Sequence, residues 1–156
     1  MKGNEKLIGA LNGLLADELS AINQYMVHAE MAENWGYGKL KKMVAMRAMT
    51  EMKHAEKLIE RILFLEGMPI VSELKKINIG SDVAKQFVHD LAAEMSAVAN
   101  YNQAIRLAQE VNDNATKELL EGILQDEDGH VDVIEEKQTQ IQQMGIQNFL
   151  AAQSSE

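Results

Sequence analysis

Apolar residues recur every three or four positions along most of the chain, which is the period of an α-helix with one buried face. The pattern is interrupted at the stretch NWGYGK (34–39), between Gly67 and Pro69, and at the stretch NDN (112–114). Glycine and proline commonly follow helix ends, and asparagine and aspartate favour turns. The pattern therefore predicts helices over residues 4–34, 39–66, 82–112, 115–144 and 146–152.

The connections between these predicted helices differ in length. Short turns join the first helix to the second and the third to the fourth, as expected for antiparallel neighbours. Residues 67–81 form a much longer connection, and Ser81 or Asp82 can cap the helix that follows. This pattern predicts an all-α, ferritin-like four-helix bundle with one long crossover connection and a short C-terminal fifth helix. No linker or change of composition divides the chain, so we expect a single domain over residues 1–156.

The composition agrees with an all-helical protein and excludes several kinds of site. Strong helix formers dominate, aromatic residues make up only 4% of the chain, and proline occurs once. The absence of cysteine excludes disulfides, thiolate zinc sites and cysteine-ligated iron–sulfur clusters. A formal net charge of −9 does not suit nucleic acid, whose phosphates need a basic face, but it suits a protein that attracts cations.

The sequence also carries expectations about location. The N-terminal segment, residues 1–19, is amphipathic and lacks the charged, apolar and small-residue regions of a signal peptide. The sequence contains no apolar run of about 18 residues, the length that a membrane helix requires. We therefore expect no membrane association and a cytoplasmic location.

Two Glu-x-x-His motifs carry the strongest chemical signal. Glu51 and His54 lie in TEMKHAE, and Glu127 and His130 lie in QDEDGHVD. Residues three apart share one face of a helix. Another glutamate precedes each motif by 33 residues, so the whole set repeats after 76 residues: Glu18 with Glu94, Glu51 with Glu127, and His54 with His130. We interpret this repeat as two helical hairpins about a pseudo-twofold axis, each contributing half of one site.

Four carboxylates and two imidazoles suit a pair of metal ions. Two such ions carry roughly four to six positive charges, which a buried site must largely neutralise. Carboxylates do so and can bridge the ions, as in the di-iron and di-manganese carboxylate proteins. We expect bridging ligands at Glu51 and Glu127, and terminal ligands at Glu18, Glu94, His54 and His130.

Two tyrosines share the spacing of the repeat. Tyr25 lies two turns after Glu18 on the same helix face, so its hydroxyl can hydrogen-bond a ligand carboxylate. Tyr101 stands in the same relation to Glu94. A structural role for either tyrosine stays open on this reasoning.

Three other polar residues carry weaker signals. His28 and His89 have no glutamate three residues before them, and we expect both at the surface or at its boundary. Asp90 lies one turn before Glu94, where it either feeds metal to the site or extends a solvated face.

These residues resemble the bacterioferritin family over essentially the whole chain. The resemblance is carried by MKGN at the start, LADELSAINQY (15–25), EMKHAEKLIERILFLEG (51–67), DEDGH (126–130) and MGIQNFLAAQ (144–153). The six proposed ligands match the family's ferroxidase centre one by one, and Tyr25 matches the tyrosine beside that centre. The second Glu-x-x-His makes the match specific, because most other ferritins lack it.

The resemblance implies an activity and an assembly. It implies a 24-subunit shell built from twofold dimers, in which a ferroxidase centre oxidises Fe(II) with dioxygen or hydrogen peroxide. Ferric mineral is then stored inside the shell. The resemblance also implies a b-type haem between two subunits, with Met52 of each subunit as an axial ligand. Haem would assist iron release, with a small ferredoxin as an electron-donating partner.

One departure from the family pattern concerns an additional iron site. Some bacterioferritins carry a histidine and an aspartate on the inner surface, and the matching residues here are Met46 and Thr50. Neither is a good ligand for Fe(II). The expectation is that this chain lacks that site or moves electrons into the cavity by another route.

Several alternatives stay open. A stand-alone di-iron peroxidase of the rubrerythrin type shares the carboxylates, although such proteins usually carry a cysteine-rich segment. A manganese catalase and a non-catalytic shell subunit are further alternatives. The sequence leaves open the preferred oxidant, the haem occupancy, a second type of subunit, and whether the iron pair is a stable cofactor or a passing substrate.

Overall fold

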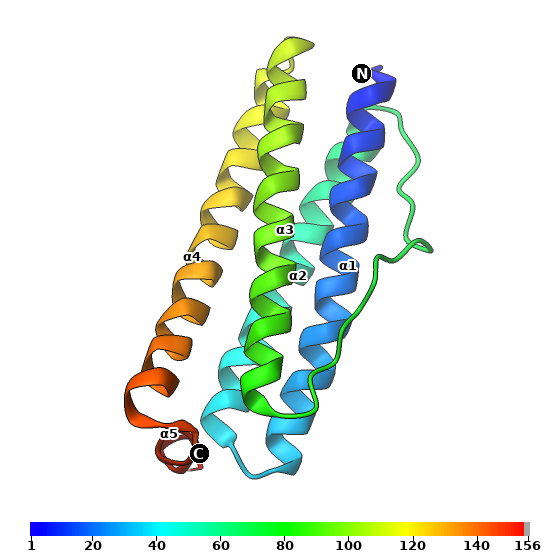
Figure 1. Ribbon diagram of the computed structural model, residues 1–156. Coiled ribbons are helices and arrows are strands. Elements are labelled where there is room, and N and C mark those ends of the chain that lie inside the picture. The colour runs from blue at the N-terminus through cyan, green and yellow to red at the C-terminus, as the bar shows by residue number, and fades with distance from the viewer. Residues whose placement is uncertain (155–156) are drawn as a thin grey trace.

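The computed structural model describes residues 1–154, and residues 155 and 156 of the predicted domain lie outside the described part. Its elements are α1 (Glu5–Asn34), α2 (Gly38–Phe64), α3 (Val83–Glu110), α4 (Asn114–Met144) and α5 (Ile146–Gln153). Figure 1 shows the four long helices side by side and α5 at one end of the bundle. Residues 1–154 contain no strand. The predicted all-α bundle with a short fifth helix is confirmed.

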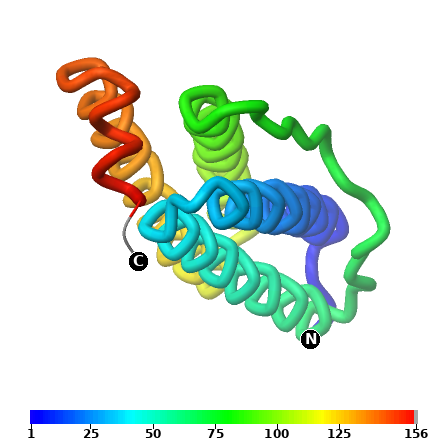
Figure 2. Tube along the Cα trace, turned by 90° about the horizontal axis from the view of Figure 1, so that it is seen from below, coloured from blue at the N-terminus to red at the C-terminus, as the bar shows by residue number. Residues whose placement is uncertain are grey.

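Two helical hairpins make up the bundle, α1 with α2 and α3 with α4. Residues 65–82 connect them and run from one end of the bundle to the other along the outside of α1 (Figures 1 and 2). This segment places α3 antiparallel to α1, so the long crossover connection is confirmed as well.

Several helix boundaries differ from the predicted ranges by one or two residues. The second helix ends at Phe64 rather than at residue 66, because Glu66 adopts a left-handed conformation with φ of 62°. The third ends at Glu110 rather than at residue 112, because Asn112 does the same with φ of 61°. At the other ends, α1 begins at residue 5, α2 at 38, α3 at 83 and α4 at 114, and α5 ends at 153. Asn4 and Asp82 precede their helices because their side chains cap the first turn.

The crossover has no regular secondary structure, and polar side chains of α1 satisfy part of its backbone. Four backbone N–H groups of the segment donate to four acceptors along one stripe of that helix. The pairs are Ile70 with Asn12 Oδ1 (2.8 Å), Lys75 with Ser20 Oγ (2.8 Å), Asn78 with Gln24 Oε1 (3.1 Å) and Gly80 with His28 Nε2 (3.0 Å). These four hydrogen bonds tie the crossover to α1 along its length, and the one from Gly80 is buried.

Apolar clusters fill the bundle on both sides of a polar middle. One cluster near the start of α1 contains Leu11, Leu15 and Leu58, all fully buried. Another, near the end of α1, contains Phe87 of α3 and Phe149 of α5, whose rings meet edge to face at 6.0 Å between centroids. Burial of each large side chain stabilises the fold by about 1.5–3 kcal/mol. This packing holds the four helices around the polar residues between the clusters.

Candidate metal centre

Six acidic and imidazole side chains converge in the polar middle of the bundle. Glu18 comes from α1, Glu51 and His54 from α2, Glu94 from α3, and Glu127 and His130 from α4. The four glutamates and His54 are at most 1% exposed, and the side chain of His130 is 17% exposed. The structure therefore brings together all six residues that the sequence repeat singles out.

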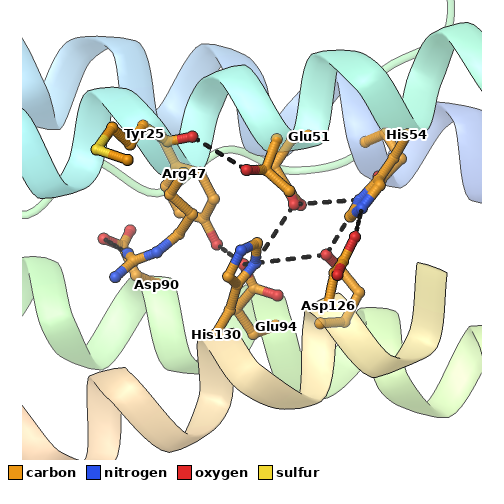
Figure 3. Close-up of polar contacts among 12 residues, drawn as sticks. Tyr25, Arg47, Glu51, His54, Asp90, Glu94, Asp126 and His130 are labelled. Carbon is orange, nitrogen blue, oxygen red and sulfur yellow. Dashed lines mark hydrogen bonds and ion pairs between the residues drawn. The ribbon is translucent and has the colours of Figure 1, made fainter. Parts of the chain in front are cut away.

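The donor atoms form two groups that share two members. Glu18, Glu51, His54 and Glu127 offer four ligand atoms within 4.8 Å of one another, and Glu51, Glu94, Glu127 and His130 offer a second such set. Figure 3 shows Glu51 lying between the two histidines. The shared residues, Glu51 and Glu127, are those for which a bridging role is expected. Each group has the donor number and chemistry of a site for one divalent metal ion.

Burial and mutual repulsion raise the pKa values of three of the four carboxylates. Burial raises the pKa of Glu18 to about 8, and the charges of Glu127 and Glu94 raise it further against the effect of His54. Burial likewise raises the pKa of Glu51 well above its ordinary value, and that of Glu94 rises for the same reason. Without metal, these groups therefore retain protons in a range where exposed glutamates are ionised.

Ion pairing shifts the pKa values of the remaining carboxylate, Glu127, and of the two histidines. Burial alone would raise the pKa of Glu127, but the imidazoles of His130 and His54, at 3.4 and 3.3 Å, outweigh it and lower that pKa. Burial alone would lower the pKa of His130, but Glu127 and Glu94 raise it to about 9. The pKa of His54 is raised far above its ordinary value in the same way, against burial, by Glu127, Glu18 and Glu51. In the metal-free centre, protons on the imidazoles take the place of cations.

The centre fits metal ions better than protons. Eight buried oxygen or nitrogen atoms of the six residues have no hydrogen-bond partner, among them both carboxylate oxygens of Glu18 and of Glu127, and Nδ1 of each histidine. Leaving such atoms unsatisfied costs about 1–3 kcal/mol each, more for charged groups. Because these donors point at one another, two divalent ions held by them would satisfy the set.

Residues around the centre hold its donors in place. The hydroxyl of Tyr25 donates to Oε1 of Glu94 at 2.5 Å, across the bundle from its own helix. The hydroxyl of Tyr101 is buried and has no hydrogen-bond partner among residues 1–154. Nε2 of His54 lies 2.8 Å from Oδ2 of Asp126, which leaves Nδ1 of His54 to face the cluster.

A buried network beside the centre was missed by sequence reasoning. His28 and Asp90 are each 1% exposed, so the expectation that His28 lies at the surface or its boundary is wrong, as is the solvated alternative for Asp90. Asp90 accepts from Gln24 at 2.8 Å, lies 2.9 Å from Nδ1 of His28, and pairs with Arg47 at 3.5 Å. The Arg47 guanidinium lies 5.2 Å from the centroid of the Tyr25 ring (Figure 3). The spacing of Gln24 and His28, one turn apart, was the available signal. His89 is half-buried, in line with a boundary position.

A cavity of about 290 Å³ leads toward the centre between α1, α3 and the crossover. Its walls include Ser20, Gln24, Lys75 and His89, and it reaches Glu18 and Glu94. Nζ of Lys75 lies 2.8 Å from Oδ1 of Asp17 on this side of the bundle. The crossover thus covers one side of the metal centre without filling the space beneath it.

The methionines that the sequence singles out lie on the surface. Met52 follows Glu51 but is 44% exposed, since it points away from the buried cluster. Met46 is 62% exposed, and the hydroxyl of Thr50 donates to the backbone carbonyl of Met46 at 3.2 Å. Both Met46 and Thr50 lie outside the two donor groups.

No helix within residues 1–154 combines the length and apolarity needed to cross a membrane. The cytoplasmic location stays a prediction.

Comparison with known proteins identifies the family. Residues 8–144 match the ferritin-like domain. The chain is 40% identical over 149 residues to a bacterioferritin of Rhodobacter capsulatus, covering 96% of this chain and 92% of the relative. It is 36% identical to bacterioferritins of Mycolicibacterium paratuberculosis, over 97% of this chain and 95% of the relative, and of Brucella melitensis, over 96% and 92%. These matches support iron storage as the general role, and the chain belongs to the bacterioferritin family.

Proposed function

We propose that the chain is the ferroxidase subunit of an iron-storage shell and that the six clustered side chains bind two Fe(II) ions as substrate. The observation that carries this proposal is the pair of donor groups that share Glu51 and Glu127. Each ion receives one terminal glutamate, one histidine and the two shared carboxylates. Two adjacent ions held in this way can deliver two electrons together.

The electron balance matches either oxidant that the sequence leaves open. Two Fe(II) ions give up one electron each and become Fe(III). Dioxygen accepts the two electrons with two protons to form hydrogen peroxide, or hydrogen peroxide accepts them with two protons to form two water molecules. The protons held on the histidines and on the raised-pKa carboxylates of the metal-free centre leave when the ions bind.

The chain's own residues hold the geometry for this step. Tyr25 orients Glu94 through its hydroxyl, and Asp126 orients His54 through Nε2. Apolar clusters flank the donors on both sides along the bundle. Low local polarity strengthens the attraction between the carboxylates and the cations.

Assembly into 24 subunits built from twofold dimers, with ferric mineral inside, is part of the same proposal and is supported by family membership. The formal charge of −9 per chain suits a surface that attracts Fe(II).

We also propose that Met52 binds haem between two subunits. The thioether fits this role because it is exposed on α2, on the same helix face as Met49 three residues before it, which is 54% exposed. When bound there, haem would supply electron transfer for iron release, with a small ferredoxin as the external electron donor. Haem takes no part in the oxidation of Fe(II) at the six-residue centre.

The test of the main proposal is iron retention. Several hundred Fe(II) ions per assembly are added in air to the metal-free protein, and iron is counted in the protein peak after size exclusion. We expect a large particle that retains far more than two ions per chain. Retention that stops near two per chain would instead favour a di-iron peroxidase of the rubrerythrin type.

A matched pair of variants separates oxidation from passive uptake. Glu127→Gln removes a shared ligand, whereas Glu56→Gln makes the same chemical change at an exposed position of α2. We expect Glu127→Gln to slow the rise of ferric absorbance at least tenfold, and Glu56→Gln to leave it unchanged. Equal rates for the two variants would favour the non-catalytic shell subunit.

A further inference from the structure

The two halves of the metal centre follow the 76-residue repeat in three contacts of each histidine. Nδ1 of His54 lies 2.8 Å from Glu18, 3.3 Å from Glu51 and 3.3 Å from Glu127. The equivalent contacts of Nδ1 of His130 are 3.3 Å to Glu94, 3.4 Å to Glu127 and 3.4 Å to Glu51. The repeat therefore relates the two halves in space as well as in sequence.

The fourth contact breaks this relation. Nε2 of His54 has a partner, Oδ2 of Asp126, at 2.8 Å (Figure 3). The residue 76 positions before Asp126 is Thr50, whose hydroxyl donates to the carbonyl of Met46 instead. Among residues 1–154, no side chain hydrogen-bonds Nε2 of His130. One histidine is thus supported by a carboxylate, and its counterpart is not.

A second difference between the two halves concerns the tyrosines beside the terminal glutamates. Tyr25 donates its hydroxyl to Glu94, the terminal glutamate of the His130 half. The counterpart, Tyr101, makes no hydrogen bond to Glu18 in the other half. A donated hydrogen bond draws negative charge from a carboxylate oxygen and occupies one of its lone pairs. Glu94 is therefore the weaker of the two terminal carboxylate donors.

We propose that the two metal positions bind their ions with different affinities, the position of Glu18 and His54 tightly and that of Glu94 and His130 more weakly. This inference rests on the proposed function, since it divides the same six side chains into two positions. Asp126 is the positioning residue that makes the difference, and Thr50 marks the place where its counterpart is missing. The greater exposure of His130, 17% against 1% for His54, agrees with this order.

The physical reason lies in the second nitrogen of each imidazole. A carboxylate that accepts the Nε2–H proton fixes the tautomer, holds the ring orientation and makes Nδ1 a stronger donor. Loss of such a partner lowers metal affinity about 10- to 100-fold. We therefore expect the metal affinities of the two positions in the unaltered chain to differ by the same factor.

The test is a titration of the metal-free assembly with Co(II), followed by visible absorption. Crystals prepared at one Co(II) per chain locate the first ion by anomalous scattering. We expect two binding phases whose dissociation constants differ about 10- to 100-fold, with the first ion beside His54. A single phase with equal occupancy, or first occupancy beside His130, overturns the inference.

Exchange of the two residues provides the stronger test. The double variant Asp126→Thr with Thr50→Asp moves the carboxylate to the other histidine, so the first ion should move to the His130 half. Thr50→Asp alone should bring the two constants closer together, and it remains informative if the double variant does not fold. Asp128→Thr is the control, because Asp128 is an exposed acid on the same helix and two residues from Asp126. If the exchanged variant binds its first Co(II) ion in the same position as the Asp128→Thr control, the role of Asp126 is overturned.

Failure of the inference and failure of the proposed function give different results. Absence of Co(II) from both donor groups would overturn the metal centre itself. Two ions bound with equal affinity would leave the metal centre in place and remove only the inequivalence.

Discussion

Nδ1 of His28 on α1 lies 2.9 Å from Oδ1 of Asp90 on α3, and a contact from the crossover determines that the His28 ring is the donor. The backbone N–H of Gly80 donates to Nε2 of His28, so Nε2 carries no proton and Nδ1 donates to the Asp90 carboxylate. Asp90 also binds Gln24 and pairs with Arg47. A single carboxylate thus joins three helices and, through His28, the crossover beside the metal centre.

Replacement of Asp90 tests this junction. Asp90→Ala leaves the Arg47 guanidinium, which is 4% exposed, without its carboxylate. We expect a loss of about 3–5 kcal/mol in the free energy of unfolding. Urea denaturation at fixed protein concentration measures the loss, and limited proteolysis should show new cleavage within residues 65–82. Asp132→Ala at an exposed position of α4 is the control, and equal losses for the two variants would contradict the prediction.

The two shared glutamates should behave differently without metal and alike with it. The pKa of Glu51 is raised by burial, so Glu51→Gln exchanges one neutral group for another and changes the free energy of unfolding by within about 1 kcal/mol. Glu127 is the ionised partner of both histidines, so Glu127→Gln costs about 3–5 kcal/mol. Thermal denaturation of metal-free protein measures this contrast. Metal analysis should find fewer than two ions per chain in both variants, and retention of two ions in either would refute shared ligation.

Metal-free stability should fall as pH rises. The folded-state pKa values of about 8 for Glu18 and about 9 for His130 lie above the ordinary values of 4.5 and 6.5. Between about pH 4.5 and pH 9 the folded state therefore binds more protons than the unfolded state, and its stability declines through this window. The melting temperature should drop by about 2–4 °C for each kcal/mol lost.

Metal should reverse the direction of this pH dependence. Binding of divalent ions needs deprotonated ligands, so metal affinity rises with pH over the same window. Scanning calorimetry of metal-free and Co(II)-loaded protein from pH 5.5 to pH 9 measures both trends. Parallel curves for the two forms would show that the six side chains do not hold the ions.

Haem binding should depend on one exposed thioether. Met52→Leu keeps the volume and apolarity of the side chain but removes the sulfur, so we expect loss of the haem absorption band after reconstitution with haem. Iron oxidation should be unchanged, because Met52 lies outside both donor groups. Met46→Leu, at a position 62% exposed, is the matched control and should retain haem. Normal haem content in Met52→Leu would exclude this ligand.

The helices and the six clustered residues were within reach of sequence reasoning because both leave regular spacings in the sequence. The period of apolar residues predicts the bundle, and the repeat of Glu18, Glu51 and His54 after 76 residues predicts the grouping of the donors. The left-handed ends at Glu66 and Asn112 shortened two helices, since the apolar pattern does not report single backbone angles.

The buried network could not be predicted in the same way. Asp90 and His28 are polar residues whose burial depends on partners 62 residues apart in the chain, and Arg47 comes from a third helix. The partner of Tyr25 likewise lies on α3, although Glu18 is its neighbour on the same helix face. Such pairings depend on how the helices pack, which spacing along one helix does not determine.

The path of the crossover limits how its length can vary. Asn12 and His28 are about 24 Å apart along α1, at about 1.5 Å per residue. The crossover covers this distance between residues 70 and 80, at about 2.4 Å per residue, and four of its backbone donors meet fixed side chains on the way. Most surface loops accept insertions and deletions, but one residue lost here would displace every later donor from its acceptor. Length differences among related chains are therefore expected to fall outside residues 70–80.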